Sequence, residues 1–241
     1  MNGTVTYMKR DFVKWGRGKV AVISALIMPA AWLIFVGLAL PVKFTGNYLD
    51  FIVPGILVMT MLSAGLSGGA LLMFDKILGF LNKFLALPTP RSSILIGKIL
   101  FITGRGLIQA TIILAIAILI GATLMHPVQY CLTYFILFLF GVMISAFATT
   151  IALYLEDHDS YSAFNTMISM PLFFTSSALM PYSVMPAWLA TIAHLNPLSY
   201  AIDAVRDVTA GGLPAIPILI LFVLTAILLA ACVQVFRRVT I

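Results

Sequence analysis

The feature that most constrains this chain is the length of its uncharged apolar runs. Val20 to Leu40 and Phe51 to Phe74 each contain more than 20 residues without any Asp, Glu, Lys or Arg. An α-helix needs roughly 20 apolar residues to cross the hydrocarbon core of a bilayer, and the apolar core of a signal peptide is shorter. The chain is 62% hydrophobic and 9% charged, with a mean hydropathy of +1.11, against about 25% charged residues in soluble domains. An integral membrane protein is therefore expected.

The whole chain, residues 1–241, is expected to form one all-α polytopic transmembrane domain, because about six spans leave little room for a soluble domain. The six spans are predicted at residues 20–40, 51–74, 98–124, 128–155, 162–180 and 214–236. Lys98 and Arg105 stand near the start of the third span. We expect both side chains to extend to the lipid headgroups, with a buried functional Arg105 as the alternative.

The distribution of basic residues predicts the orientation in the membrane, because loops rich in Lys and Arg stay in the cytoplasm. With the N-terminus inside, Lys43 and Arg206 are on the outer side. The residues on the inner side are Lys9, Arg10, Lys14, Arg17, Lys19, Lys76, Lys83, Arg91, Lys98, Arg237 and Arg238. Both termini are then cytoplasmic, and the protein is expected to be a multi-pass protein of the plasma membrane.

Two basic segments are predicted to lie in the inner membrane interface. The first is the N-terminal segment from Met1 to Lys19, which contains Lys9, Arg10 and Trp15. The second is a short amphipathic helix from Asp75 to Leu87, which Pro88 and Pro90 stop. Such a helix offers its polar side to water or to a partner protein, and the alternative is an ordinary connector. The residues available to a partner are Asp75, Lys76, Gly79, Asn82 and Lys83.

Small residues recur at four-residue spacing in the second span, among them Ser63, Ser67 and Gly68. Small side chains let the backbones of two helices approach closely. Close helix packing is the favoured interpretation of this pattern. A substrate path lined by this span is the alternative.

The segment from Met180 to Gly212 is too apolar for a free loop, yet prolines and Gly211-Gly212 interrupt it. Two short helices dipping into the outer leaflet fit it better than one span, because Asp203 and Arg206 would otherwise enter hydrocarbon. These two residues are three apart, so they can pair on one helical face. The other marked residues of the segment are Pro181, Trp188, Asn196, Pro197 and Tyr200.

The sequence contains none of the short motifs that would indicate chemistry in this chain. There is no G-x-x-x-x-G-K-[ST] phosphate loop, no H-E-x-x-H and no G-x-S-x-G. The acidic run from Glu156 to Asp159 is interpreted as a solvated turn rather than a metal site. The basic residues lie beside apolar spans, so membrane lipids rather than nucleic acid are their expected partners. We therefore expect no catalytic residue, metal or cofactor here, and transport would need energy from a partner.

The order of six spans and two segments of the chain resemble the ABC-2 type permease family of ABC exporters. The first segment is FLNKFLALPTPRSSILIGKIL after the second span, and the second is FFTSSALMPYSVMPAWLATIAHLNPLSYAIDAVRD late in the chain. The most specific matches are Ser177-x-Leu179-x-Pro181, Pro186-x-Trp188, Asn196-Pro197-Leu198 and Tyr200-x-x-Asp203-x-x-Arg206. The resemblance covers essentially the whole chain.

The resemblance implies a dimer, with a second copy of this chain or with a related permease. It also implies a separate cytoplasmic ATPase subunit that binds ATP and magnesium. The Asp75 to Leu87 helix would then be the coupling helix on that ATPase, and the segment from Met8 to Lys19 would be the interfacial helix near it. The acidic run from Glu156 to Asp159 departs from the family's usually basic loop. The residues implied to flank the substrate path are Ser63, Ser67, Gly68, Phe173 and Phe174.

The resemblance favours the membrane subunit of an ATP-driven exporter of amphipathic or lipid-like substrates, of the drug or antibiotic class. Export of a lipid-linked polysaccharide or glycolipid is a second hypothesis. A structural or regulatory membrane subunit that transports nothing is a third, from a different class.

Overall fold

The computed structural model describes residues 3–37, 48–80 and 90–238, and all regular secondary structure in these ranges is helical. The prediction of an all-α chain is confirmed. The helices, in chain order, are α1 (Gly3–Arg17), α2 (Lys19–Ala31), η1 (Trp32–Val36), α4 (Tyr48–Ile77), α6 (Arg91–Ile120), α7 (Pro127–Tyr154), α8 (His158–Phe174), η2 (Tyr182–Val184), α9 (Ala187–Leu195), α10 (Pro197–Thr209) and α11 (Ala215–Arg238).

Within the described residues, five segments are long and apolar enough to cross a membrane. They are Lys19–Val36, Tyr48–Ile77, Ser92–Ile120, Pro127–Tyr154 and Ala215–Arg238. The fifth predicted span, residues 162–180, is instead the 17-residue helix α8, which begins at His158 and ends at Phe174. At about 1.5 Å per residue α8 is roughly 26 Å long, short of a hydrocarbon core of about 30 Å. A sixth span therefore stays a prediction.

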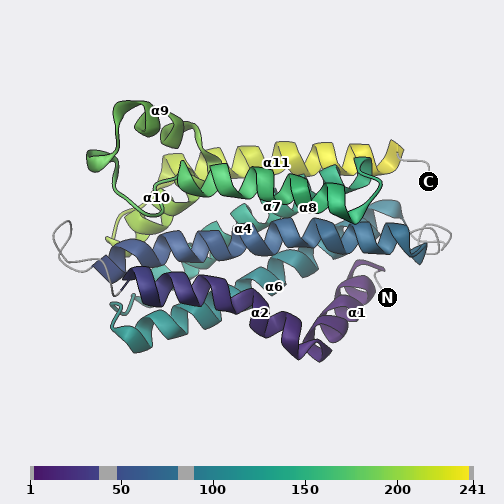
Figure 1. The fold of residues 1–241 in the computed structure, drawn as a ribbon, viewed down its shortest axis with the longest axis horizontal. Helices are drawn as coiled ribbons and strands as arrows, with labels where there is room; N and C mark the ends of the chain where they lie inside the picture. The colour runs from purple at the N-terminus through teal and green to yellow at the C-terminus, as the bar shows by residue number, and fades with distance from the viewer. Residues whose placement is uncertain (1–2, 38–47, 81–89, 239–241) are drawn as a thin grey trace.

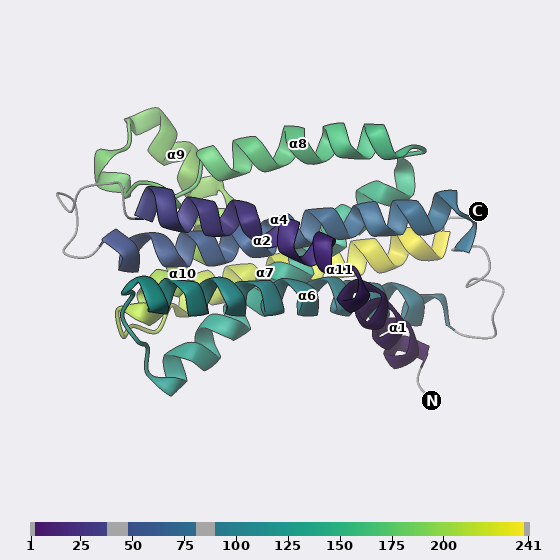
Figure 2. The same cartoon turned by 60° about the horizontal axis from the view of Figure 1, so that its bottom comes forward.

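The long helices run side by side, so the bundle has two ends (Figure 1). One end carries α1 and the last turns of α4 and α11, and we call it the α1 end. The other carries α9, α10 and the first turn of α4, and we call it the α10 end. Turned by 60°, the bundle shows α1 set at an angle across the α1 end (Figure 2).

Helices α4 and α7 form the centre of the bundle. In the most apolar 18-residue stretch of each, 78% of the residues are buried. The corresponding share is 17% for α11 and 11% for the segment formed by α2 and η1. Helix α4 is continuous over 30 residues. Near its first turn, Asp50 accepts hydrogen bonds from the Thr123 N–H (2.8 Å) and hydroxyl (2.6 Å). The peripheral α2 and α11 leave apolar side chains exposed on the outside of the bundle.

The first predicted span contains the irregular part of the bundle. Pro29 lies inside α2, and the π-helical turn η1 begins three residues later at Trp32. Proline has no N–H to donate, and single π-helical turns inside α-helices are one recognised cause of kinks. Both features are therefore local reasons for a bend in this span.

Small residues of α4 are where the neighbouring helices approach it most closely. A Cβ added at Gly65 would come within 2.6 Å of Ile144 in α7, and one at Gly68 within 2.5 Å of Ile102 in α6. A Cβ at Gly69 would overlap the hydroxyl of Tyr161 in α8, which donates a hydrogen bond to the Leu66 carbonyl. The close-packing interpretation of this stripe is confirmed at these three glycines.

We expect Gly69→Ala to loosen α8 from the bundle. Added volume at a closely packed site costs about 1 to 3 kcal/mol, because side chains or backbone must shift. The measurement is the melting temperature of the purified protein in detergent. Gly16→Ala is the matched control, because nothing lies within 4 Å of a Cβ there, and it should be neutral or slightly stabilising. Equal melting temperatures for Gly69→Ala and wild type would contradict this account of α8 docking.

Candidate functional site

Helix α1 is seated on α6 at the α1 end. A Cβ added at Gly97 would come within 2.8 Å of the Thr4 carbonyl, and one at Gly104 within 2.8 Å of Phe12. The Phe12 ring meets Phe101 edge to face, with centroids 4.9 Å apart. The two glycines are seven residues apart and therefore on one face of α6. This face fixes α1 against the bundle.

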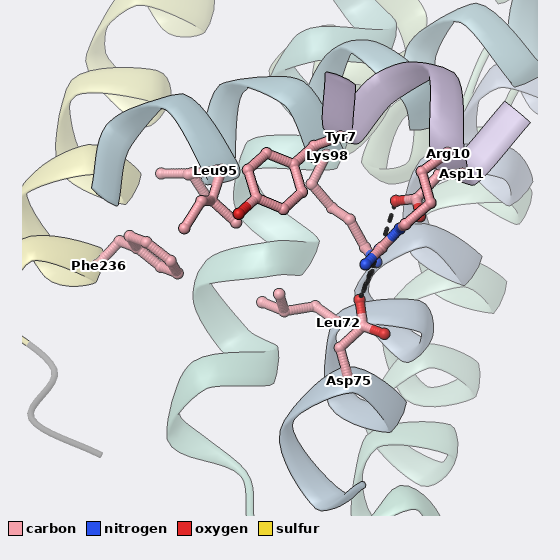
Figure 3. Close-up of a pocket in the computed structure, with 9 residues that line it drawn as sticks. Tyr7, Arg10, Asp11, Leu72, Asp75, Leu95, Lys98 and Phe236 are labelled. Carbon is pink, nitrogen blue, oxygen red and sulfur yellow. Dashed lines mark hydrogen bonds and ion pairs between the residues drawn. The ribbon is translucent and has the colours of Figure 1, made fainter. Parts of the chain in front are cut away.

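Four charged side chains from three helices form a cluster beneath α1 (Figure 3). Lys98 of α6 donates a hydrogen bond to Asp75 of α4, and its Nζ is 3.3 Å from a carboxylate oxygen of Asp11 in α1. Arg10 donates to Asp11 at 2.6 and 2.8 Å and lies 3.8 Å from Asp75. Asp11, Asp75 and Lys98 are each 6 to 8% exposed. We call Arg10, Asp11, Asp75 and Lys98 the buried ion cluster.

The buried ion cluster corrects two expectations. Lys98 does not extend to the lipid headgroups, because two carboxylates neutralise it inside the protein. Asp75 does not lie on an exposed polar face, because α4 continues past it to Ile77 and turns it towards α6. Two features of the sequence could have indicated this cluster. Asp11 is an acidic residue inside an otherwise basic segment, and Asp75 follows directly on a long uncharged run.

Arg105 is also buried, so its expected extension to the headgroups is wrong and the alternative of a buried arginine holds. The residue is 8% exposed. Its Nη2 donates to the Ala64 carbonyl (2.9 Å) and to the Ser67 hydroxyl (2.8 Å) of α4. Its guanidinium carbon lies 5.9 Å from the centroid of the Phe101 ring. Its Nε is buried and has no hydrogen-bond partner among the described residues.

A cavity of about 290 Å³ lies between the α1–α2 elbow at Gly18 and the facing sides of α4 and α6. Its lining combines apolar walls with Arg105 and with Asp11, Asp75 and Lys98 of the buried ion cluster. The lining residues are Asp11, Lys14, Trp15, Gly18, Ala21, Leu71, Phe74, Asp75, Leu78, Lys98, Phe101 and Arg105. We call it the elbow cavity.

The five residues predicted to flank a substrate path do not meet in one place. Ser67 bonds Arg105, and Ser63 is exposed one turn away on α4. Gly68 is packed against α6, and Phe173 is buried against Trp32, with ring centroids 5.3 Å apart. Phe174 is 57% exposed on the outside of the bundle. The role of these residues in transport stays a prediction.

The predicted coupling residues divide between α4 and the segment that follows it. Asp75 and Lys76 belong to the last turns of α4, so the predicted start of a separate helix at Asp75 is wrong. The Nζ of Lys76 donates to two carbonyl groups at the C-terminal end of α7, those of Leu153 (3.0 Å) and Leu155 (2.8 Å). Gly79 adopts a left-handed φ of +69°, which ends the helix. Asn82 and Lys83 lie outside the described residues.

The N-terminal residues predicted to lie at the interface are all in α1, which begins at Gly3, before the predicted Met8. Lys9 and Arg10 are exposed, and Trp15 is half-buried against the elbow cavity. Helix α1 has basic residues in its last turn and no acidic residue in its first. Its seat on α6 gives it fixed protein contacts in addition to any contact with lipid.

The acidic turn between α7 and α8 has a structural role. The Asp157 carboxylate accepts from the Ser160 N–H (2.7 Å) and hydroxyl (2.6 Å), which caps the start of α8. These hydrogen bonds from Ser160 hold the pKa of Asp157 below its ordinary value. The neighbouring His158 ring stacks on Phe74 with centroids 4.5 Å apart. Glu156, Asp157 and Asp159 are exposed, which confirms that this run is solvated, while His158 and Asp159 already belong to the first turn of α8.

At the α10 end, the segment predicted to form two short helices contains α9 and α10. Asn196 joins them: its side-chain oxygen accepts from the Leu198 N–H (2.9 Å) and caps α10, where Pro197 occupies the first turn. Its amide also donates to the Leu172 carbonyl (2.7 Å) at the end of α8. Of the remaining predicted residues, Pro181 precedes η2, Tyr200 is half-buried and Trp188 is 65% exposed.

Asp203 and Arg206 form a second polar cluster at the α10 end, and their predicted pairing is confirmed at 3.7 Å. Asp203 accepts from the hydroxyls of Ser177 (2.8 Å) and Tyr182 (2.6 Å). Burial, and then the hydrogen bond to Asp203, raise the pKa of Tyr182 to about 12. The phenol therefore stays protonated and donating at neutral pH.

Arg206 connects α10 to the start of α4. Its guanidinium lies 3.8 Å from the centroid of the Phe51 ring and donates to the Phe51 carbonyl at 3.2 and 3.3 Å. It also donates to the Ala178 carbonyl at 3.3 Å. Burial lowers the pKa of Arg206 to about 10, against the opposing effect of Asp203, so the side chain keeps its charge at neutral pH. Sequence reasoning did not find Phe51, because no pattern links it to a residue 155 positions away.

Comparison with known proteins identifies the family. The model of the ABC-2 type transporter family matches residues 3–210, which include α1 to α10 and both polar clusters. The chain belongs to the ABC-2 type transporter family. Its resemblance to ABC-2 permeases is thereby confirmed over nearly the whole sequence.

Relatives of this ABC-2 permease carry names of transport and drug-resistance proteins. It is 35% identical to the protein named transport permease ycf38 of Cyanophora paradoxa, over 83% of this chain and 71% of the relative. It is 26% identical to the protein named as the doxorubicin resistance ABC transporter permease DrrC of Mycobacterium tuberculosis, over 95% of this chain and 84% of the relative. It is 23% identical to the daunorubicin resistance ABC transporter permease protein DrrB1 of Streptomyces coeruleorubidus, over 88% of this chain and 76% of the relative.

Proposed function

We propose that this ABC-2 permease is the membrane subunit of an ATP-driven exporter, and that it moves amphipathic or lipid-like substrates of the drug class out of the cytoplasm. The observation that carries the proposal is the family match from α1 to α10. It is supported by the relatives named for resistance to doxorubicin and daunorubicin. Because the sequence has no phosphate-binding loop, the energy would come from a separate ATPase that binds ATP and magnesium.

We infer that the α1 end faces the cytoplasm. Basic residues gather there from α1, from the last turns of α4 and α11 and from the start of α6 (Figure 1). Such clusters mark the cytoplasmic side of membrane proteins. Both termini would then be cytoplasmic, in a protein of the plasma membrane, and α8 would complete a six-span arrangement. The segment from η2 to α10 would enter the outer leaflet.

A second copy of this chain, or a related permease, is the proposed neighbour in the membrane. The apolar sides of the α2–η1 segment, α8 and α11 carry exposed large residues, among them Phe35, Met167 and Phe222. These faces suit lipid, or a permease partner in a symmetric dimer.

Coupling to the ATPase is proposed for the segment that follows α4. Gly79 ends α4 in a left-handed turn, while Lys76 and Phe74 tie the end of α4 to the turn between α7 and α8. A partner seated on the segment after Gly79 would therefore act on α4, α7 and α8 together. Asn82 and Lys83 are the residues in this segment with which we expect the ATPase to make contact.

The test of this coupling is Lys83→Glu. If Lys83 meets the ATPase, reversing its charge leaves an unpaired charge at the contact, typically costing about 2 kcal/mol or more, which is roughly a thirtyfold loss of affinity. We expect less ATPase to co-purify, and ATP turnover to separate from doxorubicin transport in reconstituted vesicles. Lys9→Glu, on the exposed side of α1, is the matched control. Normal assembly and transport in Lys83→Glu would remove the coupling role from this segment.

A further inference from the structure

Arg105 carries a charge that forms no ion pair with any Asp or Glu residue of this chain. The eight Asp and Glu residues of the sequence all lie in the described ranges, and none has an oxygen within 4.0 Å of the Arg105 guanidinium. Asp11 and Asp75 line the same cavity but are paired with Lys98. Among the described residues, Arg105 donates hydrogen bonds to two neutral oxygens, the Ala64 carbonyl and the Ser67 hydroxyl.

Such an arrangement is costly because a buried charged group keeps donors that have no hydrogen-bond partner among the described residues. Charged side chains within membrane-spanning segments almost always pair with one another, with backbone carbonyls or with a water-filled cavity. A guanidinium has five N–H donors, and here Nη2 makes both of the hydrogen bonds found among the described residues. The unpartnered Nε belongs to a residue that is 8% exposed and lines the elbow cavity.

The walls of the elbow cavity indicate what kind of anion would fit. Trp15, Phe74 and Phe101 supply aromatic surface, and Leu71 and Leu78 supply aliphatic surface. Its volume of about 290 Å³ is near the lower end of the range for small-molecule pockets, about 300 Å³. Apolar walls around an arginine without an acidic partner suit a molecule that is apolar along its length and anionic at one end.

We propose that the elbow cavity binds the anionic headgroup of an amphiphile, with Arg105 as its charge partner and the aromatic walls against its apolar part. A phosphate group matches the flat, forked donors of arginine. The exposed Lys14 provides a second cation on the lining of the cavity. A membrane phospholipid and a free anionic amphiphile share this chemistry. The proposal does not depend on the exporter function, because binding needs neither the ATPase nor transport.

Trp15 offers a direct readout, because it lines the elbow cavity. Trp32→Phe and Trp188→Phe remove the other two tryptophans, and Trp188 is far away at the α10 end. The protein is placed in phosphatidylcholine nanodiscs with equal mole fractions of chain-brominated phosphatidylglycerol or chain-brominated phosphatidylcholine. We expect brominated phosphatidylglycerol to quench Trp15 more strongly. Arg105→Gln should abolish this preference. Arg17→Gln, an exposed cation on α1 outside the cavity lining, should keep it.

Two further variants keep the test decisive if Arg105→Gln does not fold. Arg105→Lys keeps the charge and should retain part of the preference, and Ala21→Phe fills the cavity without any change in charge and should remove it. The source of the anion is tested with dodecyl phosphate in pure phosphatidylcholine nanodiscs. A change in Trp15 emission that Arg105→Gln abolishes would identify a single-chain amphiphile as a ligand. Equal quenching by both brominated lipids, together with no response to dodecyl phosphate, would overturn the proposal.

Discussion

Lys98→Met is expected to destabilise the protein by about 3 to 5 kcal/mol, the typical cost of removing one partner from a buried ion pair. The substitution keeps most of the side-chain volume but leaves Asp11 and Asp75 facing each other while both are buried. Arg10 alone cannot compensate two carboxylates, because it is exposed and lies 3.8 Å from Asp75. The measurement is the free energy of unfolding in detergent, from a denaturant titration followed by circular dichroism.

Two variants separate this effect from a general loss of positive charge at the α1 end. Lys14→Met removes an exposed cation from the same region and should change stability by less than about 1 kcal/mol. Adding Asp75→Asn to Lys98→Met should restore part of the loss, because it removes one of the unpaired charges. Equal stability of Lys98→Met and Lys14→Met would mean that the buried ion cluster contributes little.

Arg206→Leu is expected to cost about 2 to 5 kcal/mol and to weaken the attachment of α10 to α4. It removes three hydrogen bonds to the carbonyls of Phe51 and Ala178 and a guanidinium 3.8 Å from the centroid of the Phe51 ring. A hydrogen bond to a charged group contributes about 1.5 to 3 kcal/mol. Asp203 also loses its ion pair. We expect a lower melting temperature and reduced export by reconstituted protein.

The matched control is Lys43→Leu, which removes the other basic residue predicted on the outer side. It should have a much smaller effect on both measurements. Arg206→Lys should lie between wild type and Arg206→Leu, because it keeps the charge but loses the forked geometry that reaches two carbonyls. Small and equal effects of Arg206→Leu and Lys43→Leu would indicate that the segment from η2 to α10 behaves as a free loop.

The parts of the fold that local sequence determines could be predicted. Long apolar runs predicted five of the six spans as helices, with boundaries a few residues away. Prolines with Asn196-Pro197 predicted the two short helices α9 and α10. The α8 segment was harder, because its polar residues from His158 to Ser162 belong to the helix while its apolar tail after Phe174 does not. Apolar composition there does not coincide with helical structure.

The candidate site was harder to predict because it depends on pairs far apart in the sequence. Counting basic residues assumes that each basic side chain is solvated. This assumption is wrong for Lys98, which pairs with carboxylates on α1 and α4. It failed for Arg105 too, since Ala64 and Ser67 receive its hydrogen bonds. The charge of Asp75 also led to the prediction that the second span ends just before it. Because Lys98 neutralises the Asp75 carboxylate, α4 continues past it to Ile77.

The continuity of α4 links the protein to the thickness of its membrane. Asp50 and Asp75 lie near its two ends, about 37 Å apart at 1.5 Å per residue. This separation exceeds a hydrocarbon core of about 30 Å and falls within the roughly 40 to 45 Å of a bilayer with its headgroups. A thinner or thicker bilayer would tilt α4 or draw one carboxylate towards the acyl chains. Since Asp75 belongs to the buried ion cluster and Phe51, beside Asp50, holds Arg206, hydrophobic mismatch would act on both polar clusters at once.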